Sequence, residues 1–217
     1  MRKKIRIAAF VVAVSVVGGV VSMMAASLAS GAEDEAGKPR LKPGQDMPPF
    51  VLNDYEGKEV SLAKLKGKVV VVAFTSQECP YSRGAEPVLA RLALAYKDKG
   101  VVVVSIDSHK DTRPEQIKEY ALGKNPTEKK LPYPIVKDSG NRYADAVGAR
   151  QTPEIYVVDA KGKLVYHGGL DNQKKPDDAE YVAYTAEALD EVLAGEPVSR
   201  PETKAYGCTI KRVPAAG

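Results

Sequence analysis

Cysteine and histidine are scarce in this sequence. Its 217 residues include only two cysteines, Cys79 and Cys208, and two histidines, His109 and His167. Two cysteines can form one disulfide, structural or catalytic, which excludes a small domain held by several disulfides. The spacing of the four residues matches no compact ligand motif, so we predict no metal site and no cofactor.

Excess charge is also absent once the first 32 residues are set aside. The whole chain has a formal net charge of +4. Four Lys or Arg and no acidic residue fall within 1–32, which leaves 28 basic and 28 acidic side chains in the remainder. No cluster of Lys and Arg interleaved with aromatic residues follows, so we expect no nucleic-acid partner.

Residues 1–32 have the pattern of a secretory signal peptide. A positive start precedes an apolar run from Ile7 to Ala29, and the small residues Ser30 and Ala32 follow it. We predict cleavage after Ala32 and export to the periplasm or the cell exterior. The apolar run is also long enough to span a bilayer, so a membrane anchor formed by residues 7–29 is the alternative.

The rest of the chain divides into three parts by composition. Residues 33–45 are rich in Gly, Pro, Lys and Glu and are predicted to form a linker. A folded domain is predicted over 46–195. Residues 196–217 are predicted to form a C-terminal tail that carries Cys208 and is irregular up to that residue.

The order of elements within the domain predicts its fold class. Apolar, β-branched runs at 68–74 and 101–106 indicate two strands buried on both faces, as in a parallel sheet. Two further apolar runs, on either side of the turn at Lys161-Gly162, indicate a hairpin. With the predicted helices, these runs indicate an α/β domain in which a mixed central sheet has helices on both faces. The helices are expected at 86–99, 111–124, 140–147 and 179–193, and the hairpin strands at 155–159 and 163–167.

Cys79 follows the first buried strand and begins the helix after it. Pro80 suits the first helical position, which makes Cys79 the expected N-cap. Free N–H groups and the positive end of the helix dipole favour a thiolate there, and the thiolate is the nucleophilic form. We therefore predict a reactive thiol. An inert buried cysteine, or one arm of a structural disulfide, is the alternative.

These residues resemble the active-site region of thioredoxins. Pro87, eight residues after Cys79, has the family's spacing, and Thr152-Pro153 before a strand resembles its second landmark. The resemblance covers about residues 46–195 and implies a thioredoxin-like fold. It also implies that Pro153 is cis and packs beside Cys79, and that the backbone of Thr152 docks an extended substrate chain.

The chain departs from thioredoxins at two positions. Ser82 replaces the second cysteine of Cys-x-x-Cys, and a serine cannot resolve a mixed disulfide. Ala73 stands where the family has a buried acid. Ser76 and Ser82 are candidate polar support for the thiol. Glu78 and Glu86 are candidates for proton transfer, although we expect both to be solvated.

The tail contains a second resemblance. Residues 207–211 are similar to the C-terminal Gly-Cys-x-Ile-Lys motif of an exported bacterial subgroup of redoxins in the AhpC/TSA–thioredoxin superfamily. This implies that Cys208 resolves disulfides formed by Cys79 in an extracytoplasmic thiol-disulfide oxidoreductase. Its partners would be cysteine-containing exported proteins or a redox donor protein. An inert Cys79–Cys208 clasp that only tethers the tail is the alternative.

Two other functions stay open at this point. In a peroxiredoxin-like thiol peroxidase, Cys79 would be oxidised to sulfenic acid and Cys208 would resolve it. Ser76 fits the Thr or Ser that peroxiredoxins carry three residues before the cysteine, but Pro153 stands where they have an arginine. That difference argues against efficient activation of peroxide. The third function is a non-enzymatic module that binds a peptide on the same surface.

Overall fold

The computed structural model describes residues 39–214, so the predicted signal peptide and membrane anchor lie outside the described residues. Among residues 39–214, no helix combines the length and the apolar character needed to cross a bilayer.

Five strands form the central sheet in the order β5-β4-β3-β7-β8. The parallel part consists of β3 (Val69–Phe74), β4 (Val101–Asp107) and β5 (Ile135–Lys137). The antiparallel part consists of β7 (Glu154–Val158) and β8 (Leu164–Gly168). The predicted mixed sheet with an antiparallel hairpin is therefore confirmed, and the hairpin lies at one edge.

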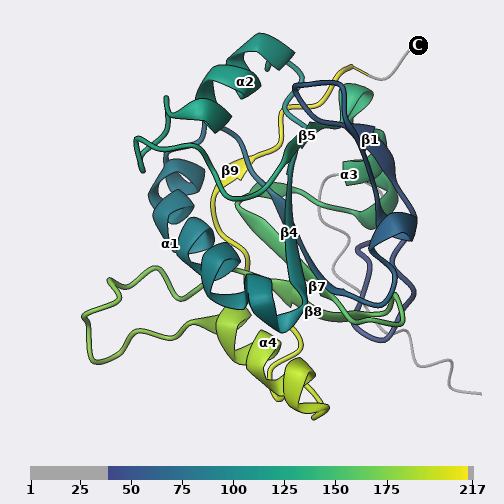
Figure 1. Cartoon of the computed structure of the whole chain (residues 1–217), viewed down its shortest axis with the longest axis vertical. Coiled ribbons are helices and arrows are strands. Elements are labelled where there is room, and N and C mark those ends of the chain that lie inside the picture. Colours follow the sequence, from purple (N-terminus) through teal and green to yellow (C-terminus); the bar gives the residue numbers. More distant parts are fainter. Residues whose placement is uncertain (1–38, 215–217) are drawn as a thin grey trace, which may run out of the picture. The chain divides into compact units, whose positions relative to one another are not determined.

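Helices cover both faces of this sheet (Figure 1). One face packs against α1 (Pro80–Tyr96), α2 (Pro114–Leu122) and α4 (Tyr184–Ala194). The other face packs against α3 (Arg142–Val147) and the segment before β1. The α/β class with helices on both faces is confirmed.

Strand β3 shows why the sheet is buried on both sides. All six of its residues are buried, and they alternate between the two hydrophobic clusters. A strand presents successive side chains to opposite faces, so a continuous apolar run fills both cores at once. Complete burial of a valine side chain stabilises the fold by about 1.5–3 kcal/mol. The strand that leads to Cys79 is thus firmly held.

The remaining elements are short. In the part of the chain that the structure describes, two pairs of strands lie outside the central sheet, and three one-turn 3₁₀ helices join larger elements. The strand pairs are β1 (Val51–Asn53) with β2 (Glu59–Ser61), and β6 (Gln151–Thr152) with β9 (Cys208–Thr209); the 3₁₀ helices are η1 (Leu62–Leu65), η2 (Lys97–Lys99) and η3 (Ser139–Asn141).

The last helix begins later than the sequence predicts. It was expected from residue 179, but α4 begins at Tyr184. Asn172 is the reason, because its side chain accepts the N–H of Val182 and donates to the carbonyl of Glu180. These bonds use backbone groups that an earlier helical turn would need.

The described residues on either side of the predicted domain contact it directly. The N–H groups of Leu41 and Gly44 donate to the carbonyls of Val147 and Leu164. In the tail, Ile210 is buried, and the short strand β9 begins at Cys208, where the predicted irregular segment ends. The tail is therefore part of the packed structure.

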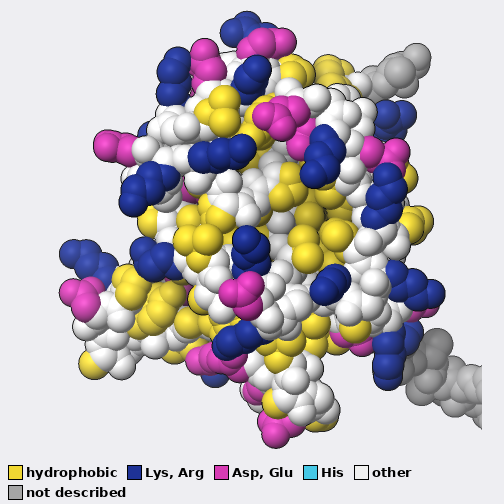
Figure 2. All heavy atoms as spheres, in the orientation of Figure 1, with side chains coloured by type: hydrophobic (Ala, Val, Ile, Leu, Met, Phe, Trp, Pro, Cys, Tyr) yellow, Lys and Arg dark blue, Asp and Glu magenta, His cyan; other side chains and the backbone are white. Residues whose placement is uncertain are grey.

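Charges of both signs are interspersed on the face shown in Figure 2, and apolar side chains lie between them. No single-sign patch dominates that face.

The packing of α4 on the sheet can be tested by two substitutions on the same helix. Leu189 is fully buried, whereas Leu193 is 38% exposed. Leu189→Ala should lower the free energy of unfolding by about 2–4 kcal/mol, because it leaves a cavity. Leu193→Ala should lower it by less than about 1 kcal/mol. Urea denaturation of both full-length variants measures this, and equal losses would contradict the packing described.

Candidate active site

Cys79 lies at the junction of β3 and α1. It is the N-cap residue of α1, Pro80 is the first helical residue, and both positions agree with the sequence prediction. The Cys79 side chain is only 2% exposed. Its thiol donates a hydrogen bond of 2.9 Å to the carbonyl oxygen of Thr152. The helix start therefore holds the sulfur against a distant part of the chain.

The two serines predicted as polar support hold the loop around Cys79. Ser76 donates its N–H to the hydroxyl of Ser82 (3.2 Å), and its own hydroxyl accepts the N–H of Glu78 (3.2 Å). The backbone N–H of Ser82 lies near enough to the sulfur to stabilise a thiolate, although the thiol makes no full capping hydrogen bond. The serines thus shape the loop, and the helix backbone faces the sulfur.

The Thr152–Pro153 bond is cis, as the resemblance implied. Thr152 lies in β6, and β6 pairs in antiparallel fashion with β9 of the tail. In this register Thr152 is opposite Cys208. The same residue whose carbonyl accepts from Cys79 therefore faces Cys208, and the fold brings together two cysteines that are 129 positions apart in the sequence.

Gly207 allows the tail to approach this closely. A Cβ at this position would collide with the carbonyl oxygen of Thr152 and lie 3.1 Å from the Cδ of Pro153. On the far side of β9, the N–H of Ile210 donates to the carbonyl of Arg150 at 2.9 Å. A side chain at Gly207 would thus force β9 away from β6.

The two thiols are free and titrate as a pair. Burial raises the pKa of Cys79, but hydrogen bonds from the Cys208 thiol, the Ser82 N–H and the Thr152 hydroxyl outweigh burial and place it below the usual value. Burial and the charge on Cys79 raise the pKa of Cys208 to about 11. Cys79 is therefore the first thiol of the pair to ionise.

A buried polar cluster behind Pro153 was missed by the sequence analysis. Glu154 is fully buried, and one of its oxygens accepts the N–H groups of Arg150 (2.7 Å) and Gln151 (2.9 Å). Its other oxygen accepts from the Tyr156 hydroxyl (3.0 Å) and lies 2.7 Å from Nε2 of His167. The only sequence signal was an acid at the start of an otherwise apolar strand.

The expectation for Glu86 is wrong. Glu86 is 2% exposed instead of solvated, and its carboxyl accepts hydrogen bonds from the hydroxyls of Tyr120 and Tyr133. Burial raises its pKa to about 7. These partners come from α2 and the loop before β5, so the spacing along α1 could not reveal the burial. Glu78 is exposed, as expected.

The two histidines lie in different surroundings. His167 packs against the ring of Tyr156, and His109 follows β4. Within residues 39–214, no group of three or more His, Cys, Asp or Glu side chains could hold a metal ion.

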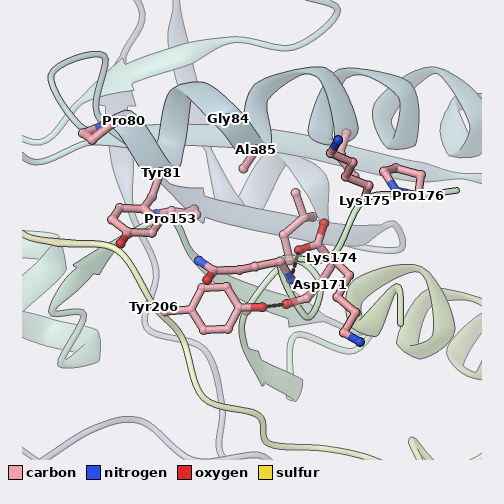
Figure 3. Close-up of a pocket in the computed structure, with 14 residues that line it drawn as sticks. Pro80, Tyr81, Gly84, Ala85, Pro153, Asp171, Lys174, Lys175, Pro176 and Tyr206 are labelled. Carbon is pink, nitrogen blue, oxygen red and sulfur yellow. Dashed lines mark hydrogen bonds between the residues drawn. The ribbon is translucent and has the colours of Figure 1, made fainter. Parts of the chain in front are cut away.

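A groove of about 640 Å³ lies beside the cis-proline (Figure 3). Pro80, Tyr81 and Pro153 line its end near Cys79, and Figure 3 shows Tyr81 next to Pro153. Across the groove, the hydroxyl of Tyr206 donates to the carbonyl of Asp171. The tail therefore provides one wall of the groove, and its largely apolar lining can bury part of a ligand.

Comparisons with known proteins agree with this geometry. The AhpC/TSA family matches residues 43–167, more than half of the chain. Among curated relatives, thiol-disulfide oxidoreductase ResA of Bacillus thuringiensis (strain Al Hakam) is 29% identical over 130 residues, which cover 60% of this chain and 71% of ResA. Chloroplastic peroxiredoxin Q of Sedum lineare is 32% identical over 155 residues, which cover 64% and 76% of the two chains.

The solved structures include a conserved protein of Geobacillus kaustophilus described as uncharacterized. Its crystal structure has a TM-score of 0.72 and 33% sequence identity to this chain, and the match covers 80% of this chain and 94% of that one. The fold is thioredoxin-like, and the named relatives support an oxidoreductase activity.

The close approach of the tail can be tested with Gly207→Ala. The added methyl group should displace β9 from Thr152 and expose Cys79, so that iodoacetamide alkylates Cys79 several-fold faster at a pH where the thiol is fully ionised. Mass spectrometry of tryptic peptide 69–83 measures the rate. Thr209→Ala is the matched control, because Thr209 is exposed on the same strand. An unchanged rate in Gly207→Ala would contradict the geometry.

The coupling of the two thiols predicts a shift in a pH profile. Cys208→Ala removes a hydrogen-bond donor from the Cys79 thiolate, so the pKa of Cys79 should rise. The rate at which Cys79 is alkylated is measured on peptide 69–83 from pH 5 to pH 10. The pKa is the pH at which this rate reaches half of its maximum. A midpoint that stays constant or falls would show that Cys208 does not stabilise the thiolate.

Proposed function

We propose that this chain, which belongs to the AhpC/TSA family, is an extracytoplasmic thiol-disulfide oxidoreductase that uses Cys79 as nucleophile and Cys208 as resolving thiol. The observation that carries the proposal is the pairing of Thr152 with Cys208, next to a Cys79 that caps a helix. The Gly-Cys-x-Ile-Lys motif and the similarity to ResA give further support.

Reduction of a substrate disulfide begins at Cys79. The thiolate attacks one substrate sulfur, a mixed disulfide forms, and the other substrate sulfur leaves as a thiolate. Cys208 then loses its proton and attacks the Cys79 sulfur, which releases the second substrate thiolate and leaves a Cys79–Cys208 disulfide. The reverse sequence oxidises a dithiol.

The charge on Cys79 orders these two steps. While Cys79 is a thiolate, its charge helps to raise the pKa of Cys208, which therefore stays protonated. Formation of the mixed disulfide removes that charge, so Cys208 ionises more easily only after the first step. Cys208 therefore becomes a nucleophile only once the mixed disulfide that it resolves has formed.

The compartment and the partners follow from the sequence. The signal pattern in residues 1–32 supports export to the periplasm or cell exterior, with an anchor at 7–29 as the alternative. Disulfides persist in those compartments. The partners are then cysteine-containing exported proteins or a redox donor protein.

A thiol peroxidase is the second candidate, and the similarity to peroxiredoxin Q favours it. Ser76 lies three residues before Cys79, but its hydroxyl accepts the N–H of Glu78. Pro153 still replaces the peroxiredoxin arginine. We rank this function second because no guanidinium is supplied at that position to activate a peroxide.

One experiment separates these functions. The reduced chain receives one equivalent of an oxidised peptide or of hydrogen peroxide, and tryptic peptides 69–83 and 205–211 are mapped by mass spectrometry. We expect rapid formation of the Cys79–Cys208 disulfide with the peptide. Cys79→Ser should abolish turnover, and Cys208→Ser should stop at an adduct on Cys79.

Other outcomes would change the conclusion. Rapid consumption of peroxide by the parent chain, with a sulfenic acid trapped on Cys79 in Cys208→Ser, would favour the peroxidase. If neither reagent oxidises Cys79, both enzymatic functions are wrong, and a binding module is left.

A further inference from the structure

Glu154 is a fully buried acid that takes no part in thiol exchange as described above. Its carboxylate accepts four hydrogen bonds, and Nε of Arg40 lies 3.9 Å away as an ion-pair partner. A buried carboxylate is costly unless it is paired, and an apolar side chain of similar size often serves packing as well. The number of its contacts therefore calls for another explanation.

The contacts of Glu154 converge on the strand between the two thiols. Its Oε2 holds the N–H groups of Arg150 and Gln151, at the start of β6. The next residue, Thr152, accepts from Cys79 and pairs with Cys208. Since β6 has only two residues, its place depends on bonds made outside its own short ladder.

The same carboxylate also reaches the tail through His167. The side chain of His167 bonds to Glu154, and its backbone bonds to the tail on both sides. The N–H of His167 donates to the carbonyl of Pro201 (2.9 Å), and its carbonyl accepts the N–H of Thr203 (3.0 Å). Glu154 thus links the strand opposite Cys208 with the point where the tail enters the site.

We propose that Glu154 is a positioning residue for the thiol pair. It fixes β6 directly and the entry of the tail through His167, so that Cys208 lies opposite Thr152 and within reach of Cys79. This inference rests on the proposed function, in which the two thiols form a disulfide. The Glu154 carboxylate does not contact the thiols. It acts by fixing the positions of two backbone N–H groups and of the His167 imidazole.

Two conservative variants distinguish the effect of the length of the Glu154 side chain from the effect of its charge. Glu154→Asp keeps the charge, but its side chain is one methylene shorter and cannot hold both N–H groups together with His167. Glu154→Gln loses the charge but keeps an oxygen for the N–H groups, and its NH₂ can donate to His167 in the other tautomer. If Glu154 acts as a positioning residue, Glu154→Asp should weaken formation of the Cys79–Cys208 disulfide, whereas Glu154→Gln should preserve it.

The readout is the equilibrium of the full-length chain with reduced and oxidised glutathione. This equilibrium reports how well Cys208 is presented to Cys79, and circular dichroism checks the fold. We expect Glu154→Asp to lower the constant for the Cys79–Cys208 disulfide by about tenfold or more, and Glu154→Gln to stay within about threefold of the parent. Glu86→Asp and Glu86→Gln are the matched controls, because Glu86 is equally buried but contacts Tyr120 and Tyr133.

Each outcome decides one of the two proposals. If the parent chain forms no Cys79–Cys208 disulfide in any glutathione mixture, the proposed function fails. If the parent forms it and Glu154→Asp has the parent's equilibrium, Glu154 does not position the pair. An equal fall in Glu86→Asp would also overturn the inference, since it would show a general effect of disturbing a buried acid.

Discussion

The pairing of β6 with β9 is the contact on which the rest of the site depends. Two residues of the tail align with Gln151 and Thr152, and this register places Cys208 beside the thiol of Cys79, the N-cap residue of α1. A pairing this short gains little from its own hydrogen bonds. Three contacts outside the ladder support the pairing. Ile210 is buried after β9, Gly207 permits the close approach of β9 to Thr152, and the Glu154 carboxylate accepts the N–H of Arg150 just before β6.

In the proposed function, the two reacting thiols come from distant parts of the sequence. In Cys-x-x-Cys both thiols share one helix turn, whereas here the second thiol arrives on a strand from the end of the chain. Its presentation to Cys79 then depends on tail packing, which is a tertiary property. The tail also lines the groove through Tyr206, so the same segment shapes both the thiol pair and the ligand surface.

Local patterns predicted the framework well. The valine runs of β3 and β4 and the Cys79-Pro80 helix start depend on neighbouring residues, so the sequence displays them directly. The burial of Glu86 and the Glu154–His167 pair depend on elements that meet only in the folded chain. The two-residue strand β9 has too few residues to show any periodicity, and only the motif around Cys208 indicated its importance.

The central claim is that Cys79 and Cys208 act as one redox unit held by the β6–β9 pairing. The ¹³Cβ chemical shifts of both cysteines, followed by NMR through a series of glutathione redox buffers, test it most directly. The account predicts that both shifts change together with a single midpoint, as one two-electron couple. A change at Cys79 alone, with Cys208 reduced throughout, would contradict it.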